Sequence, residues 1–283
     1  MFKKKGFYLL VWYLILTVLC GCSNLHKRNK HQINVCEIEV AKQKILPPSG
    51  KLIVGEKLYY KVRWLAMDVG HATLSIKEQT QIKGQPATLV ELKAWTNSFF
   101  SFFYRVDGTV KSYVNTETFQ PIKYDSQTIL KHKNVFKKME YDFENLKCFA
   151  EDKKGKYEVA ITKDVLDPLG IFYYFRKNEI SPDDPIEILI SSGKKNFPVS
   201  ILIRKQCFIR TPAGHFWAFM ILPTEESERQ FDDALNTQGS MRIWFSADEN
   251  RIPLIVDLKV PFGLARAILT DIESKSTELT QKN

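Results

Sequence analysis

The sequence predicts a mainly β protein, a β-rich α+β fold in which one or two short helices pack on a large curved antiparallel sheet or half-barrel. Apolar and polar residues alternate with a period of two through most of the chain after residue 51. Turn-forming residues recur at short intervals between these segments. The 283 residues are 44% hydrophobic and 26% charged. This composition excludes a disordered chain, a small disulfide scaffold and a multispanning membrane protein.

The first predicted strands form a hairpin. Residues 58–64 alternate between apolar and polar side chains, and residues 72–76 repeat the pattern after a turn at 68–70. This is typical of two antiparallel strands joined by a tight turn. The other predicted strands show similar patterning and cover residues 87–95, 108–115, 122–130, 135–143, 146–151, 156–161, 186–191, 197–204, 206–210, 215–222, 241–246, 254–260 and 265–271.

Two segments carry helix signals instead. Residues 97–105 read NSFFSFFYR, a short amphipathic segment with Asn97 or Ser98 as its cap. Residues 167–176 begin with Asp167 as a cap residue and a proline at the first helical position, and they end on a basic residue. Each segment is expected to form a short helix, and the second is expected to lie against the sheet.

The N-terminal segment resembles a bacterial lipoprotein signal peptide. Lysines at 3–5 precede an uncharged apolar run at 7–19 that is too short for a permanent membrane span. The following Leu-Cys-Gly-Cys sequence resembles a lipobox. The resemblance implies cleavage before Cys22 and attachment of acyl chains such as palmitate to that residue, which would anchor the protein stably in a membrane. An ordinary secretory signal and an uncleaved anchor helix are the alternatives.

The predicted organisation has three parts. Residues 1–21 are the lipoprotein signal peptide, residues 22–50 are the lipidated cysteine with a polar tether, and residues 51–283 are a single β-rich domain. Ser23 stands where inner-membrane lipoproteins usually have Asp. By analogy with bacterial lipoprotein sorting, the expected location is therefore the outer membrane of the cell envelope, with the domain facing the periplasm.

The charge balance is mildly basic. The formal net charge is +9, and it falls to +6 without the lysines of the signal segment. Such a surface suits contact with anionic headgroups, and it equally suits plain solubility. Because the chain is predicted to be exported, no nucleic-acid partner is expected.

Three thiols remain if Cys22 is lipidated, namely Cys36, Cys148 and Cys207. An exported protein can form a disulfide, and three thiols allow at most one internal bridge. Spacing does not decide the pairing. Idle or buried thiols are the default, and Cys148–Cys207 is the most compatible pair because both residues lie in strand-like segments.

Sequence signatures of catalysis are absent. The chain has no phosphate-binding glycine loop, no HExxH and no GxSxG. His71, His132 and His215 are at least 61 residues apart, and they are expected to be ordinary strand or turn residues. The acidic pairs at 183–184 and 232–233 are expected to be hydrated loops rather than calcium or acid–base sites. We therefore expect no catalytic residue, no metal and no cofactor.

Aromatic side chains are the candidates for ligand binding. If the sheet curves around a helix, they would line an apolar cavity that accepts a lipid chain. The alternative is that they fill the core. The candidates are Trp64, Trp95, Phe99, Phe103, Phe172, Trp217 and Trp244.

Several short stretches, taken in order, resemble a family of bacterial exported proteins catalogued as domain of unknown function 3108. The resemblance covers about residues 52–272. It implies an exported β-rich domain and no established activity. The stretches are residues 55–60 (GEKLYY), 70–74 (GHATL), 167–169 (DPL), 173–176 (YYFR), 211–216 (TPAGHF), 243–248 (IWFSAD) and 251–253 (RIP).

Three functions fit these observations. The first is a non-enzymatic, membrane-anchored envelope lipoprotein that binds a lipid or hydrophobic ligand. The second is an interaction scaffold that docks an envelope protein. The third is an envelope hydrolase, which ranks last because no nucleophile–base pair can be named.

Overall fold

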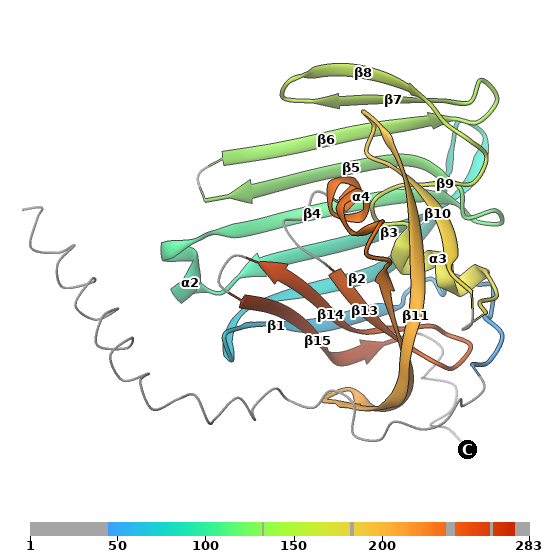
Figure 1. Cartoon of the computed structure of the whole chain (residues 1–283). Coiled ribbons are helices and arrows are strands. Elements are labelled where there is room, and N and C mark those ends of the chain that lie inside the picture. The colour runs from blue at the N-terminus through green and yellow to red at the C-terminus, as the bar shows by residue number, and fades with distance from the viewer. Residues whose placement is uncertain (1–44, 132, 182–183, 236–240, 261–262, 275–283) are drawn as a thin grey trace, which may run out of the picture. The chain divides into compact units, whose positions relative to one another are not determined.

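The computed structural model describes residues 45–131, 133–181, 184–235, 241–260 and 263–274. These residues lie within one compact unit, Ile38–Asn283, and form a fifteen-stranded sheet with three short helices (Figure 1). The first eight strands are β1 (Lys57–Trp64), β2 (Met67–Ile82), β3 (Gln85–Thr96), β4 (Val106–Asn115), β5 (Pro121–Leu130), β6 (Lys133–Asp142), β7 (Lys147–Asp152) and β8 (Gly155–Ala160). The other seven are β9 (Val165–Leu166), β10 (Ile186–Ser191), β11 (Asn196–Thr211), β12 (Gly214–Pro223), β13 (Met241–Ser246), β14 (Pro253–Val260) and β15 (Gly263–Glu273). The helices are α2 (Ser98–Phe103), α3 (Ile171–Lys177) and α4 (Glu228–Leu235).

The sheet consists of two meanders joined at their first and last strands. Its order is β8-β7-β6-β5-β4-β3-β2-β1-β15-β14-β13-β12-β11-β10-β9. β1 pairs antiparallel with β15 through residues Lys57–Trp64, so strands near the two ends of the described chain lie at the centre of the sheet. Among the described pairings, only β9 with β10 is parallel.

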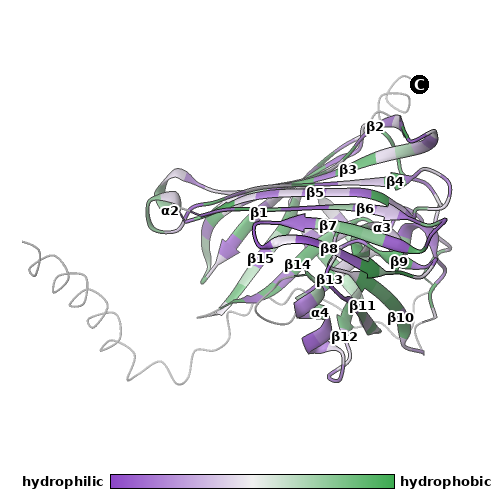
Figure 2. Cartoon of the chain, turned by 90° about the horizontal axis from the view of Figure 1, so that it is seen from above, coloured by the Kyte–Doolittle hydropathy of each residue, from purple (hydrophilic) through white to green (hydrophobic). Residues whose placement is uncertain are grey.

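The order of the strands requires the sheet to curve. Its two edge strands, β8 and β9, are consecutive in the chain and are separated by four residues. Such a connection brings Ala160 and Val165 within about 18 Å of each other. The two meanders therefore face one another across the core (Figures 1 and 2).

The turn between β10 and β11 holds the two meanders together near the sheet edges. Lys194 forms an ion pair of 2.6 Å with Asp152 at the end of β7. Asn196 donates a 2.5 Å hydrogen bond from Nδ2 to the carbonyl oxygen of Ala160 in β8. Gly193 lies so close to β6 and β7 that an added Cβ would come within 2.5 Å of the Ala150 Cβ. These contacts place the tip of a hairpin from one meander directly on strands of the other.

The core lies on the inward faces of both meanders. In the first meander the buried residues include Leu58 of β1 and Leu74 of β2, which lie opposite each other in the ladder, as the period-two pattern predicts. In the second meander α3 and α4 cover the sheet, and α4 contacts β11. The core cluster there combines helix and strand residues, namely Leu166, Ile171, Phe175, Ile188, Ile190, Val199, Ile201, Ile203, Phe219, Ile221, Phe231, Ala234, Ile243, Phe245 and Ala247.

The structure confirms the predicted fold class, because a curved and largely antiparallel sheet carries short helices on one face (Figure 2). Most strand boundaries agree with the prediction within two residues. The predicted strands 197–204 and 206–210 are one long strand, β11, whose register shifts between Ile203 and Gln206. This irregularity interrupts the alternating pattern within β11, so the sequence predicted two separate strands there.

The two predicted helices form, with one correction. Asn97 caps α2, since its Oδ1 accepts a 3.0 Å hydrogen bond from the Phe100 backbone N–H. The second helix was predicted to begin after Asp167 and instead begins at Ile171. The Asp167 side chain closes a turn that precedes the helix by accepting a hydrogen bond from the Leu169 N–H.

The prediction that residues 232–233 lie in a hydrated loop is wrong. They belong to α4, which buries Phe231 and Ala234 against the second meander. Because most of its residues are polar, the segment resembled a loop, although Phe231, Ala234 and Leu235 have helical spacing.

The cysteines do not form the disulfide that the sequence favoured. Cys148 is a free, buried thiol, and burial raises its pKa to about 12. Cys207 is disulfide-bonded, so the predicted Cys148–Cys207 pair is wrong. Cys22 and Cys36 lie outside the described residues, as do the predicted signal peptide, His132 and Asp183. No helix within the described ranges is long and apolar enough to cross a membrane.

Candidate functional site

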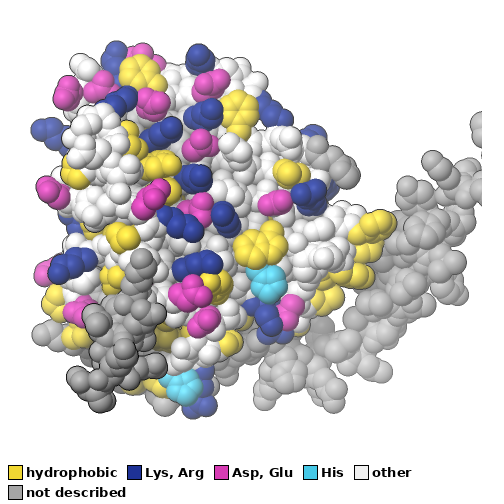
Figure 3. All heavy atoms as spheres, turned by 180° about the vertical axis from the view of Figure 1, so that it is seen from behind, with side chains coloured by type: hydrophobic (Ala, Val, Ile, Leu, Met, Phe, Trp, Pro, Cys, Tyr) yellow, Lys and Arg dark blue, Asp and Glu magenta, His cyan; other side chains and the backbone are white. Residues whose placement is uncertain are grey.

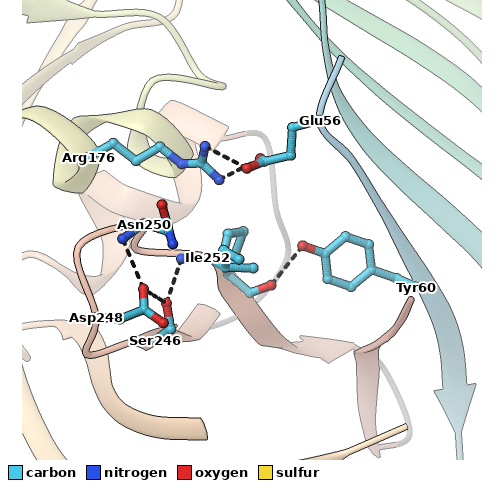
Figure 4. Close-up of polar contacts among 8 residues, drawn as sticks. Glu56, Tyr60, Arg176, Ser246, Asp248, Asn250 and Ile252 are labelled. Carbon is cyan, nitrogen blue, oxygen red and sulfur yellow. Dashed lines mark hydrogen bonds and ion pairs between the residues drawn. The ribbon is translucent and has the colours of Figure 1, made fainter. Parts of the chain in front are cut away.

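A buried ion pair ties α3 to the beginning of the first strand. The Arg176 guanidinium donates from Nη2 to Oε1 of Glu56 at 2.7 Å and from Nη1 to Oε2 at 3.2 Å (Figure 4). The two side chains are only 3% and 5% exposed. The two hydrogen bonds satisfy both carboxylate oxygens, which a buried charge requires. The pair therefore fixes the helix relative to the central strands of the sheet.

A second set of polar contacts lies beside this pair, in the turn between β13 and β14 (Figure 4). Ser246 donates from Oγ to Asp248 Oδ1 at 2.9 Å, and it accepts a 2.8 Å hydrogen bond from the Ile252 N–H. From β1, the Tyr60 hydroxyl donates to the carbonyl oxygen of Pro253 at 2.7 Å. These bonds shape the turn internally and attach it to the first strand.

A third polar cluster surrounds Asp167, which is completely buried. Its Oδ2 accepts a hydrogen bond from the Ser112 hydroxyl of β4. The Ser112 oxygen also lies 3.3 Å from the Tyr173 hydroxyl of α3. Burial raises the pKa of Asp167 to about 6, and the hydrogen bonds from Ser112, Tyr173 and Leu169 only partly oppose that rise. The cluster joins α3 to the first meander from the inside.

A perturbed carboxyl pKa marks many active sites, but a catalytic group must also reach a substrate. Asp167 has no exposed surface, and its hydrogen bonds go to its own chain. Glu56 and Arg176 are similarly enclosed. The geometry therefore supports a structural role for all three residues, in holding two meanders and a helix in one arrangement.

A hollow on the outer face of β1, β2 and β3 is open to solvent. It consists of two adjoining depressions of about 420 Å³ and 330 Å³ that share Lys57, Ser75, Lys77 and Glu91. The smaller one is also lined by Tyr59, His71 and Trp95. Figure 3 shows the molecule from the side of these strands, with cationic and anionic side chains interspersed over the surface. We refer to the two depressions together as the outer hollow.

The outer hollow combines aromatic rings with amines and carboxylates, and the buried Glu91 lies between two of the amines. Glu91 lies 3.5 Å from the Lys77 amine and 3.3 Å from the Lys93 amine, and its side chain is 9% exposed. The Lys57 amine lies 4.4 Å from the centre of the Tyr59 ring, and a hydrogen bond to Tyr59 raises the pKa of Lys57. The Lys57 amine thus stays charged at neutral pH beside an aromatic face. The arrangement suits an elongated ligand with an apolar part and an anionic end.

Comparison with protein families identifies the chain. The model of the family "Protein of unknown function (DUF3108)" matches residues 59–270. The chain belongs to the DUF3108 family. The sequence-based resemblance to this family is therefore confirmed. A comparison with curated proteins gave no match.

Two solved structures show how this DUF3108 protein compares with other folds. The "Beta-barrel-like Protein of Domain of Unknown Function DUF1849" from Brucella abortus is 8% identical, with 80% of this chain and 99% of that chain covered and a TM-score of 0.49. A "putative lipoprotein" from Parabacteroides distasonis is 9% identical, with 82% of this chain and 100% of that chain covered and a TM-score of 0.26.

Four of the seven stretches that carried the DUF3108 resemblance meet in space. Residues 55–60 supply Glu56 and Tyr60, residues 173–176 supply Arg176, and residues 243–248 and 251–253 flank the β13–β14 turn and include Pro253, which Tyr60 contacts. Figure 4 shows that these contacts lie side by side. Part of the family pattern in this chain therefore coincides with the contacts that attach α3 and the β13–β14 turn to the first strand.

The seven aromatic candidates are not brought into one cavity. Trp244 is 5% exposed, and Phe172 and Trp217 pack against the core cluster of the second meander. Phe99 and Phe103 are 68% and 66% exposed on α2. Trp64 is half-buried at the end of β1, and Trp95 is 40% exposed at the rim of the outer hollow. Of the seven, Trp95 alone lines that hollow.

Sequence reasoning missed the residues that surround Trp95 in the outer hollow. Lys57, Tyr59 and Lys93 occupy outward positions of the period-two pattern, and none of them was predicted to bind a ligand. Their cross-strand register was the available signal, because Tyr59 lies opposite Thr73, which in turn lies opposite Lys93.

The two described histidines pack on aromatic rings. The ring centre of His71 lies 6.0 Å from that of Trp95, and that of His215 lies 5.7 Å from that of Phe208. Within the ranges that the structure describes, no cluster of three or more His, Cys, Asp or Glu residues is placed to hold a metal ion.

Proposed function

We propose that this DUF3108 protein is a lipid-anchored lipoprotein of the bacterial cell envelope that acts without catalysis by binding an amphiphilic lipid in the outer hollow. The anchor is Cys22, and the expected location is the periplasmic face of the outer membrane. The lysines at 3–5, the apolar run at 7–19 and the lipobox-like sequence ending at Cys22 support the anchor.

One observation carries the ligand proposal: the outer hollow places exposed aromatic surface next to several amines. Trp95 and Tyr59 offer apolar faces for an acyl chain, and Lys57 offers a charge for an anionic headgroup. The two depressions share four lining residues, so a long chain can lie across both without entering the packed core.

A non-catalytic role is supported by the surroundings of the groups that would otherwise be suspected of catalysis. Asp167 is enclosed in the core, and His71 and His215 pack on rings of Trp95 and Phe208. General acid–base chemistry needs a titratable group within reach of a bound substrate. Of the four carboxylates that line the outer hollow, Glu91 is engaged with the amines of Lys77 and Lys93, and Glu56 is engaged with Arg176. The other two are the exposed Glu78 and Glu273.

Metabolic labelling tests the anchor. Cells that express the full chain and are fed radioactive palmitate should yield labelled protein, and the Cys22→Ala variant should lose the label. Equal labelling of the two proteins would refute Cys22 as the attachment site.

Binding measurements test the hollow. Palmitate added below its critical micelle concentration should change the fluorescence of Trp95, and hexadecanol, which lacks the anionic end, should bind more weakly. Trp95→Ala should lower palmitate affinity at least about tenfold, as measured by native mass spectrometry, because a large aromatic contact is lost. Phe149→Ala, which removes an exposed ring on β7, is the matched control. Equal affinities for the two variants would contradict the proposed site.

A further inference from the structure

The short helix α2 presents its aromatic side chains outward. Phe99, Phe102 and Phe103 are spaced to lie on one helical face, and they are 68%, 87% and 66% exposed. The helix buries none of its residues. The three rings pack on one another, with Phe103 5.5 Å from Phe99 and 5.3 Å from Phe102 between ring centres. A surface helix of a globular protein normally has the opposite orientation, with its apolar face on the core.

Polar contacts hold α2 in this orientation. Ser101 donates from Oγ to the Thr96 carbonyl oxygen at 3.1 Å. Asn97 caps the helix and also donates from Nδ2 to the carbonyl oxygen of Asp68, at the start of β2, at 2.8 Å. Ser101 and Asn97 thus face the sheet, and the rings of Phe99, Phe102 and Phe103 face away from it. The exposure of the rings is built into the attachment of the helix.

The hairpin turn next to α2 also exposes apolar side chains. Between β1 and β2 the chain turns at Leu65 and Ala66, both of which have positive φ angles, of 47° and 66°. Asn and Gly are the residues that favour this backbone conformation, and a leucine there is strained. Leu65 is nevertheless 56% exposed, and Met67 beside it is 46% exposed. An apolar side chain occupies a turn where it gains neither burial nor a relaxed backbone.

Together these residues form one apolar surface, which we call the aromatic rim. It contains six of the eleven large hydrophobic side chains that are exposed within the described ranges, namely Leu65, Met67, Phe99, Phe102, Phe103 and Tyr104. Figures 1 and 2 show α2 at one end of the sheet, where it joins the end of β3 to the start of β4. Such a concentration of apolar surface at one end of a protein marks a contact site.

The charges beside the rim indicate what it contacts. Arg105 and Lys131 adjoin Tyr104, and the Lys131 amine lies 5.0 Å from the centre of the Tyr104 ring. Lys133 is exposed at the start of β6. Arg105 is paired with Asp107, so the two lysines supply the local cationic excess. Aromatic rings flanked by basic side chains are typical of elements that lie in the interface of an anionic bilayer, where rings enter the acyl boundary and amines reach the headgroups.

We propose that the aromatic rim inserts into the surface of a lipid bilayer that contains anionic headgroups and holds the domain against it. This inference rests on the proposed membrane anchoring, which would keep the rim close to a bilayer. A short protruding helix can enter the surface of a bilayer, because the lipids rearrange around it. The rim is therefore a second membrane contact, formed by the folded domain itself.

Quenching by brominated lipid tests the proposal. The full chain is mixed with vesicles of phosphatidylcholine and phosphatidylglycerol whose acyl chains carry bromine, and it is then sedimented. A tryptophan introduced by Phe102→Trp should lose fluorescence on binding, relative to wild type. Phe149→Trp, at an exposed position on β7, is the matched control and should show no such loss. Vesicles without phosphatidylglycerol should quench Phe102→Trp less, because the lysines then lack anionic partners.

The outcomes separate this proposal from the anchor. Protein that sediments with vesicles but shows no more quenching for Phe102→Trp than for Phe149→Trp overturns the rim and leaves the anchor intact. Protein that does not sediment overturns both. The Leu65→Asn/Ala66→Gly variant adds a further readout, since it relaxes the turn and should raise the thermal midpoint while lowering the quenching of Phe102→Trp. Unchanged quenching would show that the turn at Leu65 and Ala66 takes no part in the membrane contact.

Discussion

At the scale of single residues, the buried polar groups are paired with partners from distant parts of the chain. Glu56 and Arg176 are 120 residues apart in sequence, and Ser112 and Asp167 are 55 residues apart. Removing one member of such a pair leaves the other buried without compensation, which costs more free energy than the pair itself contributes. These residues should therefore be sensitive to single substitution and more tolerant of double substitution.

Replacing Arg176 with methionine should lower the free energy of unfolding by about 3–5 kcal/mol, because the Glu56 carboxylate is left unpaired in the core. The Glu56→Gln/Arg176→Met double variant should recover a substantial part of that loss. Urea unfolding of the four proteins in a double-mutant cycle measures the coupling. A cost below about 1 kcal/mol for Arg176→Met would show that the pair is not buried in solution.

Asp167 should make stability fall as the pH rises. Burial raises its folded-state pKa to about 6 from the ordinary value of 3.8, so between these values the folded protein binds the proton and the unfolded chain does not. Stability is therefore greatest below the unfolded pKa and decreases through this window by an amount on the order of 3 kcal/mol.

The Asp167→Asn variant should lack this decrease, because the amide does not titrate. Urea unfolding at pH 4 and pH 7 should show the difference between wild type and variant shifting in favour of the variant at pH 7. If that difference is the same at both values, Asp167 does not have a raised pKa.

At the scale of elements, turns determine how the two meanders meet. Gly193 in the β10–β11 turn and Gly84 in the β2–β3 turn have similar positive φ angles, of 81° and 79°. Their surroundings differ. A Cβ on Gly193 would lie 2.5 Å from the Ala150 Cβ and 2.8 Å from the Met139 sulfur, whereas a Cβ on Gly84 would have nothing within 4 Å.

Alanine variants at the two glycines therefore separate the cost of backbone strain from the cost of disturbing the contact between the meanders. Gly84→Ala should cost about 1 kcal/mol of stability, which is the strain of a left-handed alanine. Gly193→Ala should cost a further 1–3 kcal/mol or so, because β6 and β7 must move away from the turn. Equal thermal midpoints for the two variants would mean that the β10–β11 turn does not rest on these strands.

The sequence predicted the elements better than their long-range contacts. Alternation at residues 58–64 is a local signal, and the strand there forms almost as predicted. The capping signal of Asp167 is also local, but the helix starts three residues later than predicted, at Ile171, and Asp167 instead binds Ser112. No local pattern reports that Arg176 finds Glu56, or that Tyr59 and Lys93 line one hollow with Trp95. Of the seven aromatic residues predicted to bind a ligand, only Trp95 therefore lines the outer hollow.

At the scale of the whole molecule, the connection between β8 and β9 is not needed for any strand pairing. The two meanders are joined through β1 and β15 along eight residues of β1 and through the β10–β11 turn. The short connection of residues 161–164 crosses from one sheet edge to the other.

A protease site inserted between Thr162 and Lys163, both exposed, should therefore be cleavable without loss of structure. With a reductant present, because Cys207 is disulfide-bonded and Cys148 is free, the two fragments should still elute together in size-exclusion chromatography and should keep the circular dichroism spectrum of the intact protein. They should separate only when denaturant is added to the reductant. Fragments that part under native reducing conditions would show that the β1–β15 pairing does not suffice to hold the meanders together.

The central position of β1 and β15 has a consequence for how the chain folds. When the chain is delivered from its N-terminus, β1 emerges long before β15, so the first meander can form while one flank of β1 still lacks its neighbour. That bare flank offers unpaired amide and carbonyl groups to other chains until the last strand arrives. The protein is therefore exposed to aggregation through β1 during this whole interval, and a chaperone that covers β1 would be needed only until β15 pairs with it.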